Sequence, residues 1–273
     1  TKNSKDVAEF LILELIRGGH FPNDKILESK FGDVEKIIEK YVLILKNSPV
    51  APKKKVKIQL SNWILNIAAC EIEEVLAPPR RERALIEYMT ELMEEQIKIK
   101  PGVINNEEKN TQISISTQQA LFKLDKATIS YQLLKEKYPE WLNLPSAQLE
   151  KIGQNIYSIW ENIEKDLNHP LAGRFYRILE RYDTPYLILG DILSDDPRKA
   201  QDNILNSETL ESMIKEAYFK RLNKLNSRVK RAAIFSTISI FLTKVLLALA
   251  IEVPFDRYVS GQFNLQTLGL SVL

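Results

Sequence analysis

Residues 232–251 form an apolar run that is long enough, as a helix, to cross a membrane. The run reads AAIFSTISIFLTKVLLALAI and contains one charged residue, Lys244. Twenty helical residues extend about 30 Å, which matches the hydrocarbon thickness of a bilayer. The sequence therefore predicts a transmembrane helix over residues 232–253.

The free energy of inserting this helix into a bilayer is favourable but small. Its eleven large apolar side chains contribute about −3 to −7 kcal/mol in total, whereas Lys244 costs about 2.5–3.5 kcal/mol near the helix centre. Ser236, Ser239 and Thr243 lie near one helical face, where hydroxyl groups can hydrogen-bond to a neighbouring helix. We therefore expect helix–helix association within the membrane.

A soluble alternative stays open for the same run. The central helix of a large bundle is also apolar on all sides. In that case other helices would enclose Phe235, Phe241 and Leu247, and Lys244 would be paired inside the protein. In the membrane interpretation, lipid surrounds these three side chains.

Basic residues directly precede the apolar run. Residues 215–231 contain seven Lys and Arg residues and one acid, whereas Arg257 is the only cation after residue 251. By the positive-inside rule, this asymmetry places the N-terminal part of the chain in the cytoplasm. Cations next to a membrane segment also attract anionic lipid headgroups. The predicted membrane contacts are Lys220, Arg221, Lys224, Arg228, Lys230, Arg231 and Lys244.

The charges divide the chain into two parts. Residues 215–273 carry a net charge of +6 and the remainder a net charge of −4. Because this distribution lacks a broad basic face, nucleic acid is not an expected partner. The single cysteine, Cys70, excludes an internal disulfide and fits a reducing compartment.

Helical periodicity dominates the rest of the chain. Apolar stripes at helical spacing run from Leu60 to Leu76, Leu85 to Ile97, Leu121 to Leu134 and Leu149 to Leu167. Only QISIS, residues 112–116, alternates as a strand would, and it is too short to matter. The predicted fold class is all-α: a multi-helix bundle followed by a long helix that runs into the transmembrane segment.

Loops expected at 47–57 and 100–113 suggest the domain boundaries, since both are polar or rich in proline and lysine. The predicted parts are a small N-terminal helical subdomain (1–47), a main helical bundle (57–206), a basic juxtamembrane helix (207–231), the transmembrane helix (232–253) and the start of a second, truncated membrane helix (263–273).

Residues 4–46 have the outline of a helix-turn-helix, with Gly32 in the turn and a second helix over residues 33–45. The positions of this helix that we expect to be exposed carry acids as well as lysines, which is a poor set for reading base edges. Packing or protein contact is therefore the favoured interpretation. These positions are Glu35, Lys36, Glu39 and Lys40.

The loop after this segment contains four lysines that are candidates for contact with lipid or other phosphates. A plain solvated loop is the alternative, and it is the commoner explanation for such a run. The lysines are Lys53, Lys54, Lys55 and Lys57.

Motifs for catalysis, cofactors or metals are absent from the sequence: it has no GxxxxGK[ST], GxGxxG, HExxH or paired CxxC. His20 and His169 lie beside Gly19 and Pro170, where they read as loop or cap residues. We therefore expect no cofactor, no metal and no catalytic residue. Two acidic clusters are interpreted as a solvated helix face and a helix cap: Glu71, Glu73 and Glu74, and Asp191, Asp195 and Asp196.

The sequence thus favours a membrane-anchored helical protein whose cytoplasmic domain acts by binding, as a scaffold, adaptor or regulator, and not as an enzyme. Its expected partner is a membrane with anionic lipids, and the sequence does not specify a protein partner. Two alternatives stay open. One is a membrane-tethered DNA-binding regulator that uses residues 4–46, and the other is an enzyme that acts on a lipid or a membrane-borne substrate.

Overall fold

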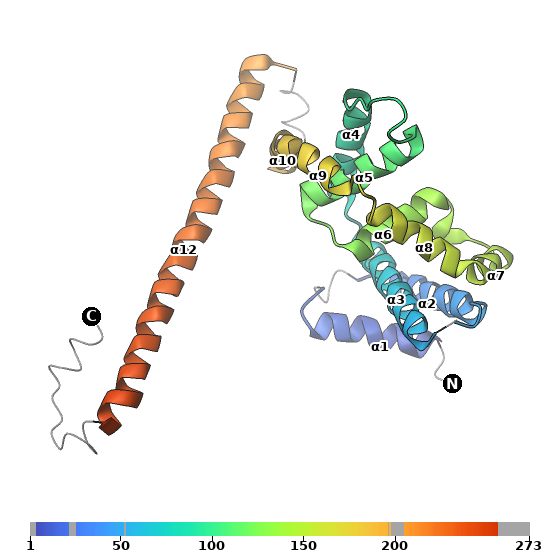
Figure 1. Cartoon of the computed structure of the whole chain (residues 1–273), viewed down its shortest axis with the longest axis horizontal. Helices are drawn as coiled ribbons and strands as arrows, with labels where there is room; N and C mark the ends of the chain where they lie inside the picture. Colours follow the sequence, from blue (N-terminus) through green and yellow to red (C-terminus); the bar gives the residue numbers. More distant parts are fainter. Residues whose placement is uncertain (1–3, 22–25, 52, 196, 198–204, 256–273) are drawn as a thin grey trace. The chain divides into compact units, whose positions relative to one another are not determined.

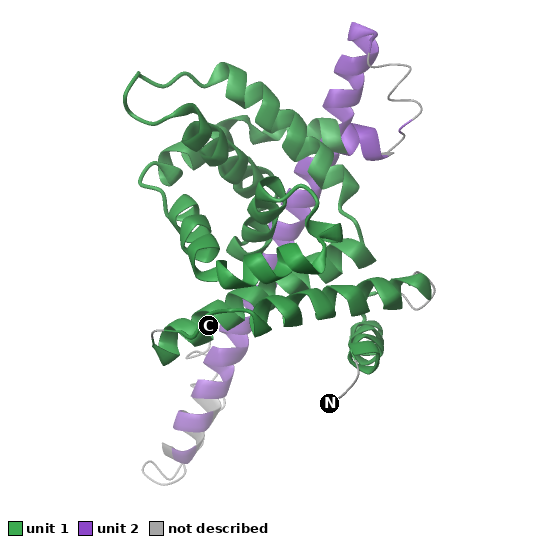
Figure 2. Ribbon diagram, turned by 90° about the vertical axis from the view of Figure 1, so that its right-hand side faces the viewer, with its two compact units in different colours: residues 1–190 green, residues 191–273 purple. Residues whose placement is uncertain are grey.

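The computed structural model of the chain describes residues 4–21, 26–51, 53–195, 197 and 205–255. All regular structure within these residues is helical, which confirms the all-α prediction. The chain divides into two compact units, residues 1–190 and residues 191–273 (Figure 2).

The larger of two hydrophobic cores in residues 1–190 forms around α2 (Ser29–Lys46). This helix packs against α1 (Ser4–Arg17), α3 (Lys54–Leu76) and α7 (Ser146–Gln154). Apolar residues at helical spacing, such as Ile37 and Ile44 on α2 and Ile64 and Ile67 on α3, face this core. The segment expected to be a separate subdomain, residues 1–47, therefore shares its core with later helices (Figure 1).

The second core is formed by α4 (Arg80–Gln96), α5 (Asn106–Phe122) and α9 (Ala172–Leu179). The other helices described in residues 1–190 are α6 (Lys126–Lys137), α8 (Ile156–Leu167) and most of α10 (Asp183–Asp195), which continues into the second unit. Short 3₁₀ helices are described at η2 (Trp141–Asn143) and η3 (Glu180–Tyr182).

Helix α5 takes part in both cores, although its sequence is largely polar. Ile115 belongs to the first core, whereas Ile113 and Leu121 belong to the second. The predicted loop 100–113 ends earlier than expected, because the side chain of Asn105 accepts a hydrogen bond from the backbone N–H of Glu108 (2.7 Å) and so caps the helix. The alternating segment 112–116 is therefore helical.

Two of the predicted stripes are each divided between two helices. The stripe from Leu121 to Leu134 is interrupted at Lys123, which has a left-handed backbone (φ 53°) and ends α5. The stripe from Leu149 to Leu167 is interrupted at Asn155, between α7 and α8. No proline lies at either break: Asp125 accepts from the backbone N–H of Thr128 at 2.9 Å and caps α6, and Asn155 donates to the carbonyl of Lys151 at 2.9 Å.

The helix-turn-helix outline of residues 4–46 is wrong in its central feature. Helix α2 runs without interruption from Ser29 to Lys46, so Gly32 lies inside the helix and not in a turn. Lys40, expected on the exposed face of the second helix, is instead buried. The apolar positions Val34, Ile37 and Tyr41 place Lys40 on the buried side of the helix.

The second unit contains one long helix, α12 (Ser207–Phe255), which has 49 residues and therefore a length of about 74 Å (Figure 1). It begins at the start of the predicted juxtamembrane helix and continues without a break into the predicted span. Near its start, Ala217 is buried, as is Ile192 at the end of α10.

Within the part of the chain that the structure describes, no helix combines the length and the apolar character needed to cross a membrane. The transmembrane assignment of residues 232–253 thus gains no support here and stays a prediction. The side chains of Ala248, Leu249 and Val253, and the whole predicted second membrane segment 263–273, lie outside the described residues.

Candidate functional site

All seven cations predicted to contact lipid lie on α12, and six of them precede the apolar run that contains Lys244. Five of them, which we call the basic face, recur at spacings of one, three, four and three residues and so share one side of the helix. They are Lys220, Arg221, Lys224, Arg228 and Arg231. Lys230 projects from a different side.

An apolar stripe lies next to the basic face on the same part of α12. Its residues follow each other at spacings of four, four, three and four, and all of them are exposed in the structure: Ile214, Tyr218, Leu222, Leu225 and Val229. A basic face beside an apolar stripe is the pattern of helices that lie at the membrane–water interface.

The cations of α12 differ in the partners that they contact. Arg221 donates to Asp191 at 2.8 Å, an ion pair within the second unit. Arg231 donates to the backbone carbonyl of Ser227 at 3.3 Å. Lys224, Arg228 and Lys230 have no ion-pair partner in the described part of the chain, so their charge is available to an external anion.

The apolar half of α12 leaves its large side chains uncovered within its own unit. Phe235 is 69 % exposed, and Phe241 and Leu247 are each 54 % exposed. Lys244 is exposed and makes no hydrogen bond or ion pair with the other described residues. The soluble alternative requires other helices to enclose these three side chains and a partner for Lys244 inside the protein. The described residues of the second unit do not by themselves meet either requirement.

The hydroxyl groups expected to join neighbouring helices are partly used within α12. Thr243 Oγ1 donates to the carbonyl of Ser239 at 2.8 Å, and Thr237 Oγ1 donates to the carbonyl of Ala233 at 2.9 Å. A hydroxyl that bonds one turn back needs no second helix to satisfy it. Ser236 and Ser239 are therefore better placed than Thr243 to bond to a neighbour.

The lysine loop of the sequence becomes one wall of a pocket at the N-terminus of α3, with a volume of about 480 Å³. Lys53, Lys54 and Lys57 line it, whereas Lys55 does not. Ser48, from the connection that follows α2, and Tyr157, from α8, line it from elsewhere in the chain. No sequence pattern predicted that Tyr157 would lie there.

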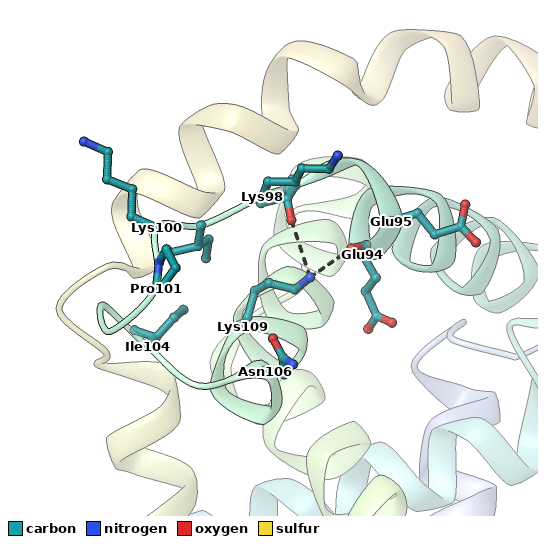
Figure 3. Close-up of a pocket in the computed structure, with 10 residues that line it drawn as sticks. Glu94, Glu95, Lys98, Lys100, Pro101, Ile104, Asn106 and Lys109 are labelled. Carbon is teal, nitrogen blue, oxygen red and sulfur yellow. Dashed lines mark hydrogen bonds between the residues drawn. The ribbon is translucent and has the colours of Figure 1, made fainter.

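A second concavity, of about 510 Å³, lies between the end of α4 and the start of α5 (Figure 3). Lys109 points into it and donates to the carbonyls of Glu94 (2.9 Å) and Ile97 (3.4 Å). It therefore caps the C-terminus of α4, a structural role. Because Glu95 and Lys98 also line this concavity, acids and bases offset each other there.

A buried polar network in residues 1–190 was missed by sequence reasoning. Lys40 on α2 pairs with Glu71 on α3 and donates to the backbone carbonyl of Trp141 at 3.0 Å. Glu71 also accepts from the hydroxyl of Tyr41 (2.8 Å) and from Nε1 of Trp141 (3.0 Å). Glu71 was expected on a solvated face, and that expectation is wrong because it continues the buried stripe of Leu60, Ile64 and Ile67.

We interpret this network as a packing feature, because the side chains of Lys40, Tyr41, Glu71 and Trp141 hydrogen-bond to one another in the core. Burial lowers the pKa of Lys40, and the carboxylate of Glu71 acts in the opposite direction. Burial also raises the pKa of Tyr41 well above its ordinary value, as does the negative charge of Glu71.

No group of three or more His, Cys, Asp or Glu residues that could hold a metal ion occurs among the described residues. Asp191 is engaged by Arg221, while the side chain of Asp195 and all of Asp196 lie outside the described part. His169 Nδ1 accepts from the backbone N–H of Leu171 at 3.2 Å, the cap-like role expected for it.

Neither a family model, nor a curated protein, nor a solved structure matches this chain. The functional interpretation therefore depends on the chemistry of the surfaces described above.

Proposed function

We propose that this protein is attached to a membrane through the apolar half of α12 and acts by binding at the cytoplasmic membrane surface, as a scaffold, adaptor or regulator. One observation carries the proposal. A single continuous helix joins cations that have no ion-pair partner among the described residues, such as Lys224 and Arg228, to uncovered apolar side chains such as Phe235 and Leu246.

The uncovered apolar side chains favour an apolar environment. Burying a large aliphatic or aromatic side chain stabilises by about 1.5–3 kcal/mol relative to leaving it in water. Nine large apolar side chains between residues 234 and 251 are exposed: Ile234, Phe235, Ile238, Ile240, Phe241, Leu242, Leu246, Leu247 and Ile251. They occur on every side of the helix, which fits surrounding lipid better than a single docked partner helix.

The position of the cations on α12 favours contact with anionic lipid, and it also suggests on which side of the membrane residues 1–190 lie. Each cation near an anionic membrane surface contributes about 1 kcal/mol of binding free energy. Because the cations precede the apolar segment, the positive-inside rule assigns residues 1–190 to the cytoplasmic side. The DNA-binding alternative is not carried further, since α2 has no turn at Gly32.

Fractionation of the intact protein tests the attachment. We expect the full chain to sediment with membranes after gentle lysis and to resist extraction at high salt. The double variant Phe241→Asp/Leu246→Asp is expected to move to the soluble fraction, because each aspartate costs about 2.5–3.5 kcal/mol near the centre of an inserted helix.

A matched control is available in the first unit. Leu65 on α3 is 60 % exposed and Leu246 is 65 % exposed, so Leu65→Asp makes the same chemical change on an equally open surface. This variant should stay with the membrane fraction. Wild-type protein found wholly in the soluble fraction would end the proposal.

A further inference from the structure

The pocket at the N-terminus of α3 concentrates positive charge without any acid to neutralise it. Lys53, Lys54 and Lys57 line the pocket, and no aspartate or glutamate does. None of the three lysines has an ion-pair partner among the described residues. Three ammonium groups around one concavity repel each other, so the pocket gains stability when an anion occupies it.

From this geometry we propose that the pocket binds a phosphomonoester group. The pocket lies wholly within residues 1–190, so the inference goes beyond the attachment through α12 and does not depend on it. Its volume of about 480 Å³ falls in the range of sites for small molecules.

Helical spacing explains why two of these lysines converge and Lys55 does not. Lys54 and Lys57 are separated by three residues, so their side chains share one face of α3. Lys53 precedes the helix with an extended backbone and lines the same pocket. Leu60 and Ser61 continue this face by another turn and also line the pocket. Lys55 projects from a different side of the helix and stays outside the pocket.

Neutral donors add to the charge of the lysines. Helix α3 begins after Lys53, whose side chain makes no capping hydrogen bond, so the first backbone N–H groups of the helix are not capped by that residue. Such groups stabilise an anion together with the helix dipole. Ser61 and Tyr157 also line the pocket, and their hydroxyl groups make no hydrogen bond with other described residues.

The composition of the pocket favours a phosphomonoester over other anions. A phosphomonoester carries a charge of about −1.5 to −2 at neutral pH and three acceptor oxygens, which match several ammonium groups and hydroxyl donors. Leu45, Val50 and Leu60 supply an apolar surface beside the cations, which suits the carbon body of such a ligand. The group could belong to a lipid headgroup or to a soluble phosphorylated molecule.

Two binding measurements on the full chain distinguish these sources. In the first, the chain is reconstituted in nanodiscs of phosphatidylcholine and titrated with glycerol 3-phosphate by calorimetry. In the second, its binding to vesicles that contain phosphatidic acid, a phosphomonoester, is compared with binding to vesicles that contain phosphatidylglycerol, a phosphodiester. Saturable binding in the first identifies a soluble ligand, and a preference for phosphatidic acid identifies a lipid.

Variants at two neighbouring lysines distinguish binding in the pocket from a non-specific effect of net charge. Lys57→Gln is expected to weaken the observed binding about tenfold, because it removes a charge-assisted hydrogen bond. Lys55→Gln removes the same charge two residues away and should change binding less than twofold. Tyr157→Phe should weaken binding severalfold without any change of charge. Because both lysines are exposed, melting temperatures should stay unchanged.

Failure of this inference is distinguishable from failure of the membrane attachment. Neutralising the cations of α12 would weaken vesicle binding but leave the titration with glycerol 3-phosphate unchanged. Equal losses for Lys55→Gln and Lys57→Gln, or no binding in either measurement, would overturn the phosphomonoester site.

Discussion

Lys40 on α2 and Glu71 on α3 form an ion pair in the interior of residues 1–190, where only 7 % of the first side chain and 1 % of the second are exposed. The rings of Tyr41 and Trp141 lie beside the ammonium group, with centroids at 5.4 and 5.0 Å. Because the pair joins α2, α3 and η2, it fixes how these elements meet.

Removal of one partner of this pair should strongly destabilise the folded state. Lys40→Met leaves the carboxylate of Glu71 buried without its cation, and we expect the free energy of unfolding to fall by about 3–5 kcal/mol. The double variant Lys40→Met/Glu71→Gln should recover part of this loss, since an amide oxygen still accepts from Tyr41 and Trp141. Urea unfolding followed by tryptophan fluorescence measures both.

The control for this pair lies on the same helix. Lys36 is exposed, so Lys36→Met should change the free energy of unfolding by less than about 0.5 kcal/mol. If Lys36→Met and Lys40→Met destabilise equally, the buried pair does not have the importance assigned to it.

Two glycines provide a second comparison. A Cβ on Gly153 would lie 2.7 Å from the carbonyl oxygen of Ile44 and 2.8 Å from Cβ of Asn47, so Gly153→Ala should separate α7 from α2 and destabilise by about 1–3 kcal/mol. Around Gly173 on α9 there is open space, and Gly173→Ala should stabilise by about 0.4–1 kcal/mol. Thermal unfolding of both variants checks the opposite signs.

Stability should depend on pH through Glu74. Burial alone would raise the pKa of this carboxyl, but Lys135 (2.7 Å) and Arg83 (2.6 Å) outweigh it and hold the pKa below the ordinary value of 4.5. A lowered pKa means that the folded state binds the proton less tightly, so this contribution is present at neutral pH. It is lost as the pH falls through the lowered value.

Glu74→Gln should therefore reduce the free energy of unfolding at pH 7 by about 1–2 kcal/mol and weaken its dependence on pH below 4.5. Denaturant titrations between pH 3 and 7 compare it with the wild type. A variant whose curve runs parallel to that of the wild type would show that Glu74 is not responsible.

The cations of α12 should determine the preference for anionic lipid. The triple variant Lys224→Gln/Arg228→Gln/Lys230→Gln is expected to bind vesicles with anionic lipid about 100-fold more weakly, at about 1 kcal/mol for each charge. Binding to neutral vesicles should change little. Vesicle flotation at low and high salt measures the difference.

A control with the same change of net charge is Lys36→Gln/Lys98→Gln/Lys151→Gln, which alters exposed lysines of the first unit. It should retain most of its affinity for anionic vesicles. Comparable losses in both triple variants would assign the effect to total charge and not to α12.

Sequence patterns predicted the helical class and the extent of several elements. The stripe that ends before Pro78 became α3, and the long helix expected from residue 207 onward became α12. These features are local, because helical periodicity and the stop at a proline depend on residues a few positions apart.

Features that depend on distant residues could not be read in this way. Lys123 ends α5 in a left-handed conformation and contacts Tyr176 (2.9 Å) and Glu180 (3.0 Å), more than fifty residues later. Tyr157 joins the lysine pocket from α8. In each case the partner is brought close only by the packing of helices.

Sequence by itself therefore determined that this chain is helical, and where its basic segment meets its apolar one, because both depend on neighbouring residues. Tertiary structure decided which polar residues are buried. Lys40 and Glu71 each continue an apolar stripe, but a charged side chain enters a core only when an opposite charge meets it there. That partner lies 31 residues away, on another helix.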